Sequence, residues 1–278
     1  NGVFYGYSPQ QELLQYRTAN SKTFQNPDGT NTILMVGPTH YKDDNGVLQD
    51  IKYTITPNNS NRNTEYKYCN TTNELKTYFP ETPVKNGIRF NYAKFDFDFW
   101  RNPSMKFKVG DKLIASEKAK NTVANTLENK IFYTETYQGI KEEFEILENT
   151  KGVEHTIMLD KLPSLFPKEA DATLEFTQFI PVKKGWKIFS DTIEKITNFT
   201  ANSFYIEIGD EKIHFNPIII FDNQIASKKL ANEILNRLTE RITEEQKVLL
   251  KNISKGSYFV EFVEGGIQLT YRIDGNWL

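Results

Sequence analysis

The sequence alternates short runs of β-branched and aromatic residues with turn motifs, and this pattern continues through most of the chain. Its longest example spans residues 88–99, where the apolar side chains occupy even positions up to 92 and odd positions from 95 onward. Because side chains of a strand repeat every two residues, this change of parity predicts a bulge or a chain reversal near 93–94. Strands separated only by turns are typical of antiparallel sheets and argue against a parallel α/β fold.

Turn motifs separate the predicted strands in the first part of the chain, at Asn26–Gly29 and Asp43–Gly46. Proline presets φ for a turn, and Asn and Gly tolerate the left-handed conformations that hairpins require. Later in the chain, residues 204–215 predict a tight hairpin, and residues 258–273 predict a terminal hairpin around 265–266. Each hairpin joins neighbouring runs, so we expect antiparallel pairing within it.

One segment has a helical period instead. Apolar residues recur every four positions between 226 and 250, in a stretch without Gly or Pro, which predicts an amphipathic helix of about six turns. The helix packs either on a sheet of its own chain or on a partner. Its candidate interface residues are Leu230, Ile234, Leu238 and Ile242. We therefore expect a mainly β fold of antiparallel β-sandwich domains, with one C-terminal amphipathic helix followed by a β-hairpin.

The length of 278 residues suits two domains. Residues 1–16 predict an N-terminal arm that docks on its own core or on a neighbour. Residues 17–162 predict a β-sandwich domain, and residues 168–278 predict a second β-rich domain that contains the helix. The boundary is placed at 163–167, where two prolines interrupt strand pairing.

Composition narrows the classes of function. Lys and Arg number 34 and Asp and Glu 36, a net charge of −2, so the chain lacks the basic excess of a duplex nucleic-acid binder. No apolar run approaches the roughly 20 residues that cross a bilayer, so we expect no membrane insertion. The single cysteine, Cys69, excludes an internal disulfide framework, and the three histidines have no zinc-site spacing. We expect neither a metal nor a cofactor.

Catalytic motifs with a known mechanism are missing from the sequence: it has no nucleophile elbow, P-loop, dinucleotide fingerprint or zinc-protease helix. Glycoside hydrolysis needs only two carboxylates at a set separation. The carboxylates that keep this alternative open are Asp96, Asp98, Glu142, Glu143 and Glu145. Since charged residues on the solvent face of a strand are the ordinary case, we predict that the chain is not an enzyme.

Aromatic side chains are the other candidates for recognition, because Tyr and Trp stack on sugars and anchor protein interfaces. The candidate surface or interface residues are Tyr5, Tyr7, Trp100, Trp186 and Trp277. Each tryptophan lies beside a predicted strand end or turn, where the competing interpretation is a side chain that fills the core or its rim.

Part of the chain resembles the leading segment of large bacterial surface and secreted proteins of the Rhs/YD-repeat and wall-associated type. The motifs that carry this resemblance are Arg17 with Lys22-Thr23-Phe24, Asp28-Gly29, Pro38-Thr39-His40-Tyr41, and Gln49-Asp50-Ile51. The likeness is good over residues 17–90, weaker to about 220, and missing in the predicted helix and tail. It implies a β-rich, non-catalytic module of an exported or particle-borne protein. We interpret His40 as a packed residue that donates a hydrogen bond within a sheet.

Together these observations predict a non-enzymatic structural or adhesive subunit of an extracellular or virion assembly, either a phage structural protein or a cell-surface component. It would be extracellular, on the cell surface or in a virion. Its partners would be other protein subunits of the same assembly, in a homo-oligomer or a multi-protein particle, with a surface glycan as a further ligand. The alternatives are a carbohydrate-binding, lectin-like module and a glycoside hydrolase with an acidic pair.

Overall fold

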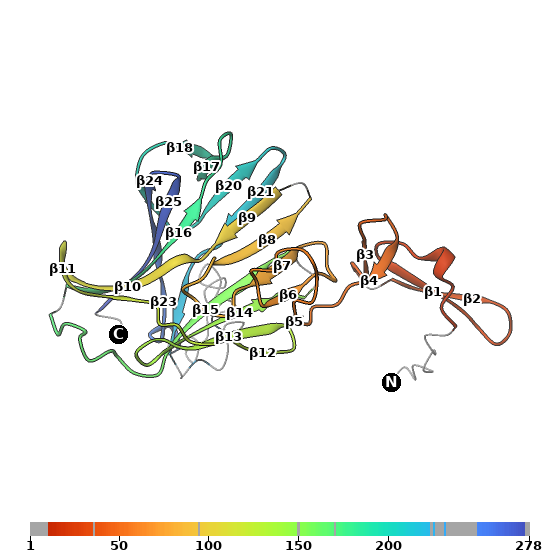
Figure 1. Cartoon of the computed structure of the whole chain (residues 1–278), viewed down its shortest axis with the longest axis horizontal. Helices are drawn as coiled ribbons and strands as arrows, with labels where there is room; N and C mark the ends of the chain where they lie inside the picture. Colours follow the sequence, from red (N-terminus) through yellow and green to blue (C-terminus); the bar gives the residue numbers. More distant parts are fainter. Residues whose placement is uncertain are drawn as a thin grey trace. The chain divides into compact units, whose positions relative to one another are not determined.

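The computed structural model of the chain is mainly β, and a short 3₁₀ helix, η2 (Leu14–Tyr16), precedes the first strand (Figure 1). The residues that it describes are 11–275 except 36, 94, 149–150, 170, 223–224, 226–230 and 232–248. Strand pairs with a defined register are antiparallel, as in the long pairs of the largest sheet. The predicted mainly β, antiparallel fold is therefore confirmed.

The chain divides into two compact units whose sequence ranges interleave. The first unit comprises residues 1–97, 122–136 and 140–158, and the second comprises 98–121, 137–139 and 159–278. The chain passes from the first unit to the second for the last time between Met158 and Leu159, close to the predicted boundary at 163–167. The stretches at 98–121 and 137–139 belong to the second unit, although the sequence pattern placed them in the first domain.

Within its described residues, the first unit contains two two-stranded sheets, a five-stranded sheet and a four-stranded sheet. The small sheets pair β1 (Ser21–Gln25) with β2 (Asn31–Met35) and β3 (His40–Lys42) with β4 (Leu48–Asp50). The five-stranded sheet has the order β5 (Thr56–Pro57), β6 (Tyr68–Asn70), β7 (Lys76–Phe79), β8 (Ile88–Tyr92) and β9 (Phe95–Phe99). The four-stranded sheet has the order β12 (Asn125–Leu127), β13 (Lys130–Tyr137), β14 (Ile140–Ile146) and β15 (Val153–Leu159).

Strands β8 and β9 are neighbours in one sheet and consecutive in the chain, so of the two predicted alternatives, a bulge or a chain reversal, the structure has the reversal. Ala93 has φ of 50°, the left-handed conformation that a tight reversal needs. Strand β14 shows how alternation builds the core of this unit, because every second side chain is buried from Ile140 to Ile146. Phe144, at its centre, is fully buried and contacts the ring of Tyr133 edge-on at 6.1 Å between centroids.

The described part of the second unit contains a six-stranded sheet, a four-stranded sheet and one further pair of strands. The six-stranded sheet has the order β11 (Lys112–Lys118), β10 (Arg101–Val109), β16 (Ala172–Pro181), β25 (Gly266–Asp274), β24 (Ser257–Val263) and β19 (Phe199–Ala201). The four-stranded sheet has the order β18 (Ile193–Lys195), β17 (Lys187–Ser190), β20 (Phe204–Ile208) and β21 (Glu211–Phe215). The remaining pair joins β22 (Ile219–Phe221) to β23 (Ile253–Lys255).

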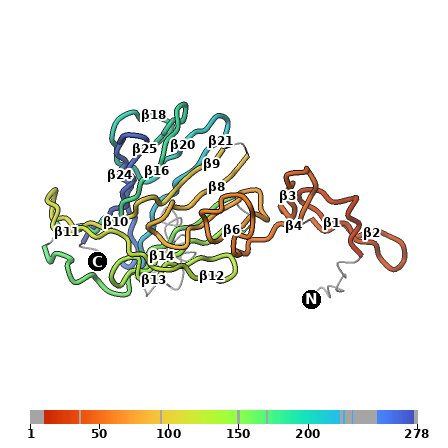
Figure 2. Tube along the Cα trace, in the orientation of Figure 1, coloured from red at the N-terminus to blue at the C-terminus, as the bar shows by residue number. Residues whose placement is uncertain are grey.

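Both hairpins predicted in this unit are confirmed. Strands β20 and β21 pair around Gly209, and Figures 1 and 2 show them side by side. Strands β24 and β25 pair over their length around Gly265, the terminal hairpin. Most of the predicted helix, including Leu230, Ile234, Leu238 and Ile242, lies outside the described residues. The described positions Ala231, Leu249 and Leu250 have helical backbone and pack with the apolar residues of β22 and β23.

No helix in the described ranges combines the length and the apolarity that a bilayer span needs.

Candidate functional site

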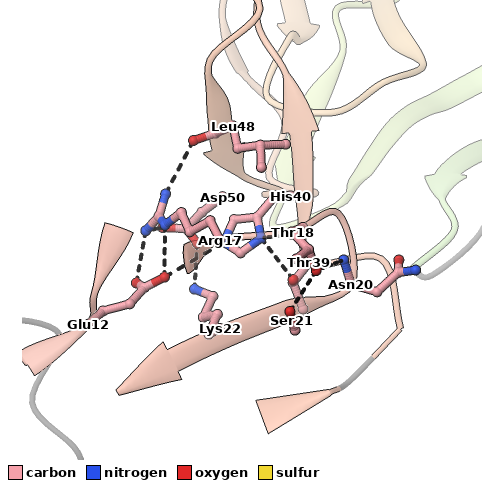
Figure 3. A network of polar contacts seen from close by, with 10 residues as sticks. All are labelled: Glu12, Arg17, Thr18, Asn20, Ser21, Lys22, Thr39, His40, Leu48 and Asp50. Atoms are coloured by element: carbon pink, nitrogen blue, oxygen red, sulfur yellow. Dashed lines mark hydrogen bonds and ion pairs between the residues drawn. The ribbon is translucent and has the colours of Figure 1, made fainter. Parts of the chain in front are cut away.

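Charged side chains gather around a buried histidine in the first unit, and we call this group the His40 cluster (Figure 3). Its members are Glu12, Arg17, Lys22, His40 and Asp50. It combines two acids, two cations and one imidazole in mutual contact.

Short antiparallel pairings bring these residues together. Glu12 forms an isolated bridge with Phe24 of β1, so the chain entering η2 runs along that strand. His40 begins β3 and lies directly opposite Asp50, the last residue of β4. The backbone N–H of His40 also donates to the carbonyl of Ala19 over 3.2 Å, which fixes β3 against the turn before β1.

The strongest contact of the cluster is a two-point ion pair. Nε and Nη2 of Arg17 each donate to a carboxylate oxygen of Glu12 over 2.8 Å. Both side chains are largely buried, at 13% and 6% exposed. Arg17 also donates to the carbonyl of Leu48 at 3.3 Å and to Asp50 at 3.4 Å, so its guanidinium joins Glu12 to β4. Hydrogen bonding to Glu12 raises the pKa of Arg17, with burial opposing and Asp50 assisting.

Asp50 lies between three cations or potential cations. Lys22 donates to its carboxylate, and Arg17 and His40 approach it at 3.4 Å. Partial burial by itself raises the pKa of Asp50, but the hydrogen bond and charge of Lys22, followed by the charges of Arg17 and His40, outweigh it and lower the pKa below its ordinary value. The carboxylate is therefore ionised at neutral pH and held by its neighbours.

His40 itself is inaccessible, with a side chain 0% exposed. Its Nδ1 lies 2.7 Å from the carbonyl of Thr18, and because a carbonyl only accepts, Nδ1 carries the proton and donates it. The interpretation of His40 as a packed donor is thereby confirmed, but its acceptor, Thr18, lies just before β1 and not within a sheet. Its Nε2 has no hydrogen-bond partner and faces Asp50 at 3.4 Å and Glu12 at 3.9 Å. These contacts become ion pairs when the ring carries both protons.

The hydroxyl of Thr39 lies 3.1 Å from Nδ1, so Thr39, His40 and Asp50 follow the order of a nucleophile, a base and an acid. The chemistry of such a triad requires Nδ1 to accept the hydroxyl proton, whereas Nδ1 donates to Thr18. The ring is also closed to a substrate. The cluster is therefore suited to fastening η2, β1, β3 and β4 to one another, and not to general-base catalysis.

The carboxylates that kept glycoside hydrolysis open have separate surroundings. Alternation along β14 buries Glu142, at 2% exposed, where its Oε1 lies 3.3 Å from Nε2 of His155. Glu143 and Glu145 lie on the opposite face and share the ammonium of Lys130, at 2.8 and 2.9 Å. The pair nearest in sequence, Glu142 and Glu143, is thus split between two faces of one strand.

The other two carboxylates, Asp96 and Asp98, lie within β9. Asp96 is exposed and accepts a hydrogen bond from the amide of Asn91. Asp98 has a side chain 15% exposed and lies 3.9 Å from the guanidinium of Arg101, three residues further on. Both contacts are short-range in sequence and typical of strand ends and turns.

The single cysteine is a core residue of the first unit. Cys69 is 6% exposed and clusters with Tyr66 and Tyr78. Burial raises the pKa of its thiol, more than a hydrogen bond with Thr56 lowers it. Since the thiolate is the reactive form, this thiol is a poor nucleophile.

Of the aromatic candidates, two lie in the described residues. Trp100 is 1% exposed and has φ of 56°, so its side chain belongs to the core of the second unit and offers no surface to a ligand. Trp186 is half-buried, and the ammonium of Lys183 lies 5.6 Å from the centre of its ring. Tyr5, Tyr7 and Trp277 lie outside the described residues.

Sequence reasoning singled out His40 but missed its four charged neighbours. Arg17, Lys22 and Asp50 stand in the same motifs that carried the family resemblance, and a search for opposite charges among those motifs is the signal that finds them. Glu12 lies just before these motifs and gives no local signal.

No protein-family model matches this chain, and neither the curated proteins nor the solved structures contain a match to it. The resemblance to Rhs/YD-repeat proteins therefore rests on the sequence motifs alone.

Proposed function

We propose that this chain is a structural or adhesive subunit that acts through protein–protein contacts in a cell-surface, extracellular or virion assembly. The observation that carries the proposal is the apolar surface of its outer strands. On β2, Ile33 and Met35 are 64% and 77% exposed, and on β11, Leu113 and Ile114 are 51% and 45% exposed. Contiguous exposed apolar side chains mark interaction surfaces in soluble proteins.

The charged side chains also support this proposal, because they bind one another. The His40 cluster directs its charges at one another, and Glu143 and Glu145 are held by Lys130. Side chains engaged in this way stabilise a scaffold, and they are not poised to transform a substrate. The proposal therefore assigns no catalytic role to the chain.

Two finer features of architecture belong to this proposal. The sheets of each unit would pack face to face as antiparallel sandwiches, which buries one face of each sheet and leaves the outer strands for contacts. The segment at about 226–250 would form an amphipathic helix before the β24–β25 hairpin. Its stripe of Leu230, Ile234, Leu238 and Ile242 would provide a second contact surface.

Hydroxyl-radical footprinting of the chain in its native source tests the proposal, because methionine oxidises readily when exposed. We expect the chain to sediment with a larger assembly and Met35 to be oxidised several-fold less there than in the purified chain. Met105, which is 0% exposed, is the internal control and should resist oxidation in both samples. A chain that sediments alone, with Met35 equally reactive in both samples, would contradict the proposal.

A glycan array and a polysaccharide hydrolysis assay on the purified chain separate the remaining alternatives. A structural subunit that contacts proteins gives a blank array and releases no sugar. Specific glycan binding would favour the lectin-like module instead, and hydrolysis that is lost in Glu142→Gln or Glu143→Gln would favour the glycoside hydrolase.

A further inference from the structure

Strand β2 presents apolar side chains on both faces of a very small sheet. Ile33 and Met35 point to one face and Leu34, which is 39% exposed, points to the other. Among the described residues its sheet has two strands, β1 and β2, and Glu12 adds an isolated bridge on the far side of β1. Two strands by themselves are marginally stable in water, and further strands with an apolar face stabilise such a sheet.

The backbone of β2 also directs hydrogen-bonding groups outward. Thr23 of β1 lies opposite Ile33, and its carbonyl accepts a hydrogen bond of 2.8 Å from the N–H of Leu13, on the side away from β2. In an antiparallel ladder both backbone groups of a residue face the same side, and successive residues alternate. Ile33 therefore directs its N–H and C=O away from β1. Asn31 and Met35, two positions to either side, do the same.

Other outer strands of five or more residues in the described sheets carry charges, which natural proteins use to prevent edge pairing. These charges are Lys22 on β1, Asp96 and Asp98 on β9, Lys112, Glu117 and Lys118 on β11, Glu154 on β15, and Glu211 and Lys212 on β21. Strand β2 has neither a charge nor a proline, and no Lys, Arg, Asp or Glu occurs between Asp28 and Lys42. Two copies of β2 therefore meet without like-charge repulsion, and their lengths and apolar side chains match.

We propose that β2 pairs with β2 of a second copy of this chain, antiparallel about a twofold axis at Ile33. This inference rests on the proposed function and names its partner. Each Ile33 then faces Ile33 of the second copy, and Asn31 faces Met35. The outward groups form about six backbone hydrogen bonds. The product is a four-stranded sheet in the order β1-β2-β2-β1, with a self-complementary interface.

The expected affinity of this contact is low. A pair of five-residue strands buries less than the roughly 800 Å² per partner of a standard interface, so the free chain should dimerise weakly. An assembly that holds many copies raises their effective concentration to about the millimolar range, where a weak contact is occupied. Pairing through β2 is thus suited to lateral association within an assembly.

Sedimentation velocity of the purified chain, from about 10 μM to about 1 mM, tests the pairing. We expect a monomer–dimer equilibrium that Ile33→Lys weakens at least tenfold, because two lysines would meet across the axis. An equimolar mixture of Ile33→Lys and Ile33→Glu should recover dimers, because opposite charges then face each other. Recovery by mixing is specific to a homotypic contact centred on this residue.

Ile193→Lys is the matched control. Ile193 is 60% exposed on β18, an outer strand that already carries Glu194 and Lys195, and its substitution should leave dimerisation unchanged. Circular dichroism of each variant shows that the fold is retained. A wild-type chain that stays monomeric throughout, dimers that persist in Ile33→Lys, or a mixture that does not recover them would each overturn the inference.

These outcomes are distinct from failure of the proposed function. If Ile33→Lys has no effect but the chain still sediments with its native assembly, the function stands and only the β2 pairing is wrong. If the chain also sediments alone in its native source, both are wrong.

Discussion

Two regions of this chain are held together by opposite means. Among the described residues of 11–50, the buried side chains are Ser21, Thr23 and His40, and charged partners surround the histidine. In the six-stranded sheet of the second unit, Phe107 and Leu174 are among the side chains at most 1% exposed, and they are apolar. We call residues 11–50 the polar segment.

Stability and adaptability therefore lie in different parts of this chain. Apolar packing is non-directional and scales with the area removed from water, so the large sheet draws its stability from many buried side chains. A segment stabilised by a few ion pairs depends on each of them, and it has low local stability, as is common for binding regions. The polar segment also carries β2, the strand that we propose as a contact.

The largest expected effect is on the apolar sheet. Phe107 is 1% exposed on β10 and meets the ring of Phe166 edge-on at 5.8 Å between centroids. Phe107→Ala should destabilise the second unit by about 3–5 kcal/mol, through lost burial and a cavity. Chemical denaturation followed by tryptophan fluorescence measures it, since Trp100 and Trp186 lie in this unit.

Two matched variants sharpen that result. Phe107→Leu, which retains most of the volume, should cost less than about 1.5 kcal/mol. Ile33→Ala, at an exposed apolar position of the polar segment, should change stability by no more than about 0.5 kcal/mol. If Phe107→Ala and Ile33→Ala lowered the free energy of unfolding equally, the two regions would not differ in how they are stabilised.

The next effect concerns the polar segment. Arg17→Met leaves the carboxylate of Glu12, 6% exposed, without its two-point partner. Removing one member of a buried ion pair costs about 3 kcal/mol, because the remaining charge stays buried. Hydrogen exchange of peptides from residues 11–50 should therefore accelerate strongly, while peptides of the six-stranded sheet stay protected.

The double variant Glu12→Gln with Arg17→Met provides the control. It removes the orphaned charge as well, so it should recover a large part of the lost protection. If the single variant exchanges like the wild type, the ion pair does not hold the segment.

The sequence predicts the apolar regions better than the polar one, for a physical reason. The reversal near 93–94 and the hairpins of β20–β21 and β24–β25 follow from patterns that repeat every two residues and from adjacent turn residues, all of which are local. The contact of Arg17 with Asp50 joins residues 33 positions apart and depends on the register of three separate pairings. No periodicity encodes it.

Predictions for single residues fail for the same reason, because long-range contacts decide their surroundings. Trp100 follows a strand in the sequence, and nothing local distinguishes an exposed ring from the buried one that the second unit contains. The interleaving of the units at 98–121 and 137–139 arises from long-range strand pairing. The sequence also does not predict the exposure of β2, because Thr32–Val36 has the composition of an ordinary half-buried strand.

A smaller change in stability is expected from relieving backbone strain in a turn of the second unit. Asp191 and Thr192 connect β17 to β18 with φ of 48° and 68°, the left-handed pair of a type I′ turn. A β-branched residue is strained there, so Thr192→Gly should stabilise the second unit by about 0.5–1 kcal/mol in chemical denaturation. Gly209→Ala, at φ of 61° in the neighbouring hairpin, is the reciprocal control and should destabilise by a similar amount.

The smallest effect is the response of the polar segment to acid. The pKa of Asp50 is lowered because Lys22, Arg17 and His40 outweigh its partial burial, so its contribution to stability is complete above the unfolded value of about 3.9 and is lost as pH falls through the folded value. Solvent screens the carboxylate, which is 41% exposed, and keeps this contribution small. Amide resonances of residues 11–50 in nuclear magnetic resonance spectra should therefore shift or broaden below about pH 4, before those of the six-stranded sheet. Asp50→Asn should weaken this pH dependence, because the amide does not titrate, whereas an unchanged acid response in that variant would assign it to other groups of the segment.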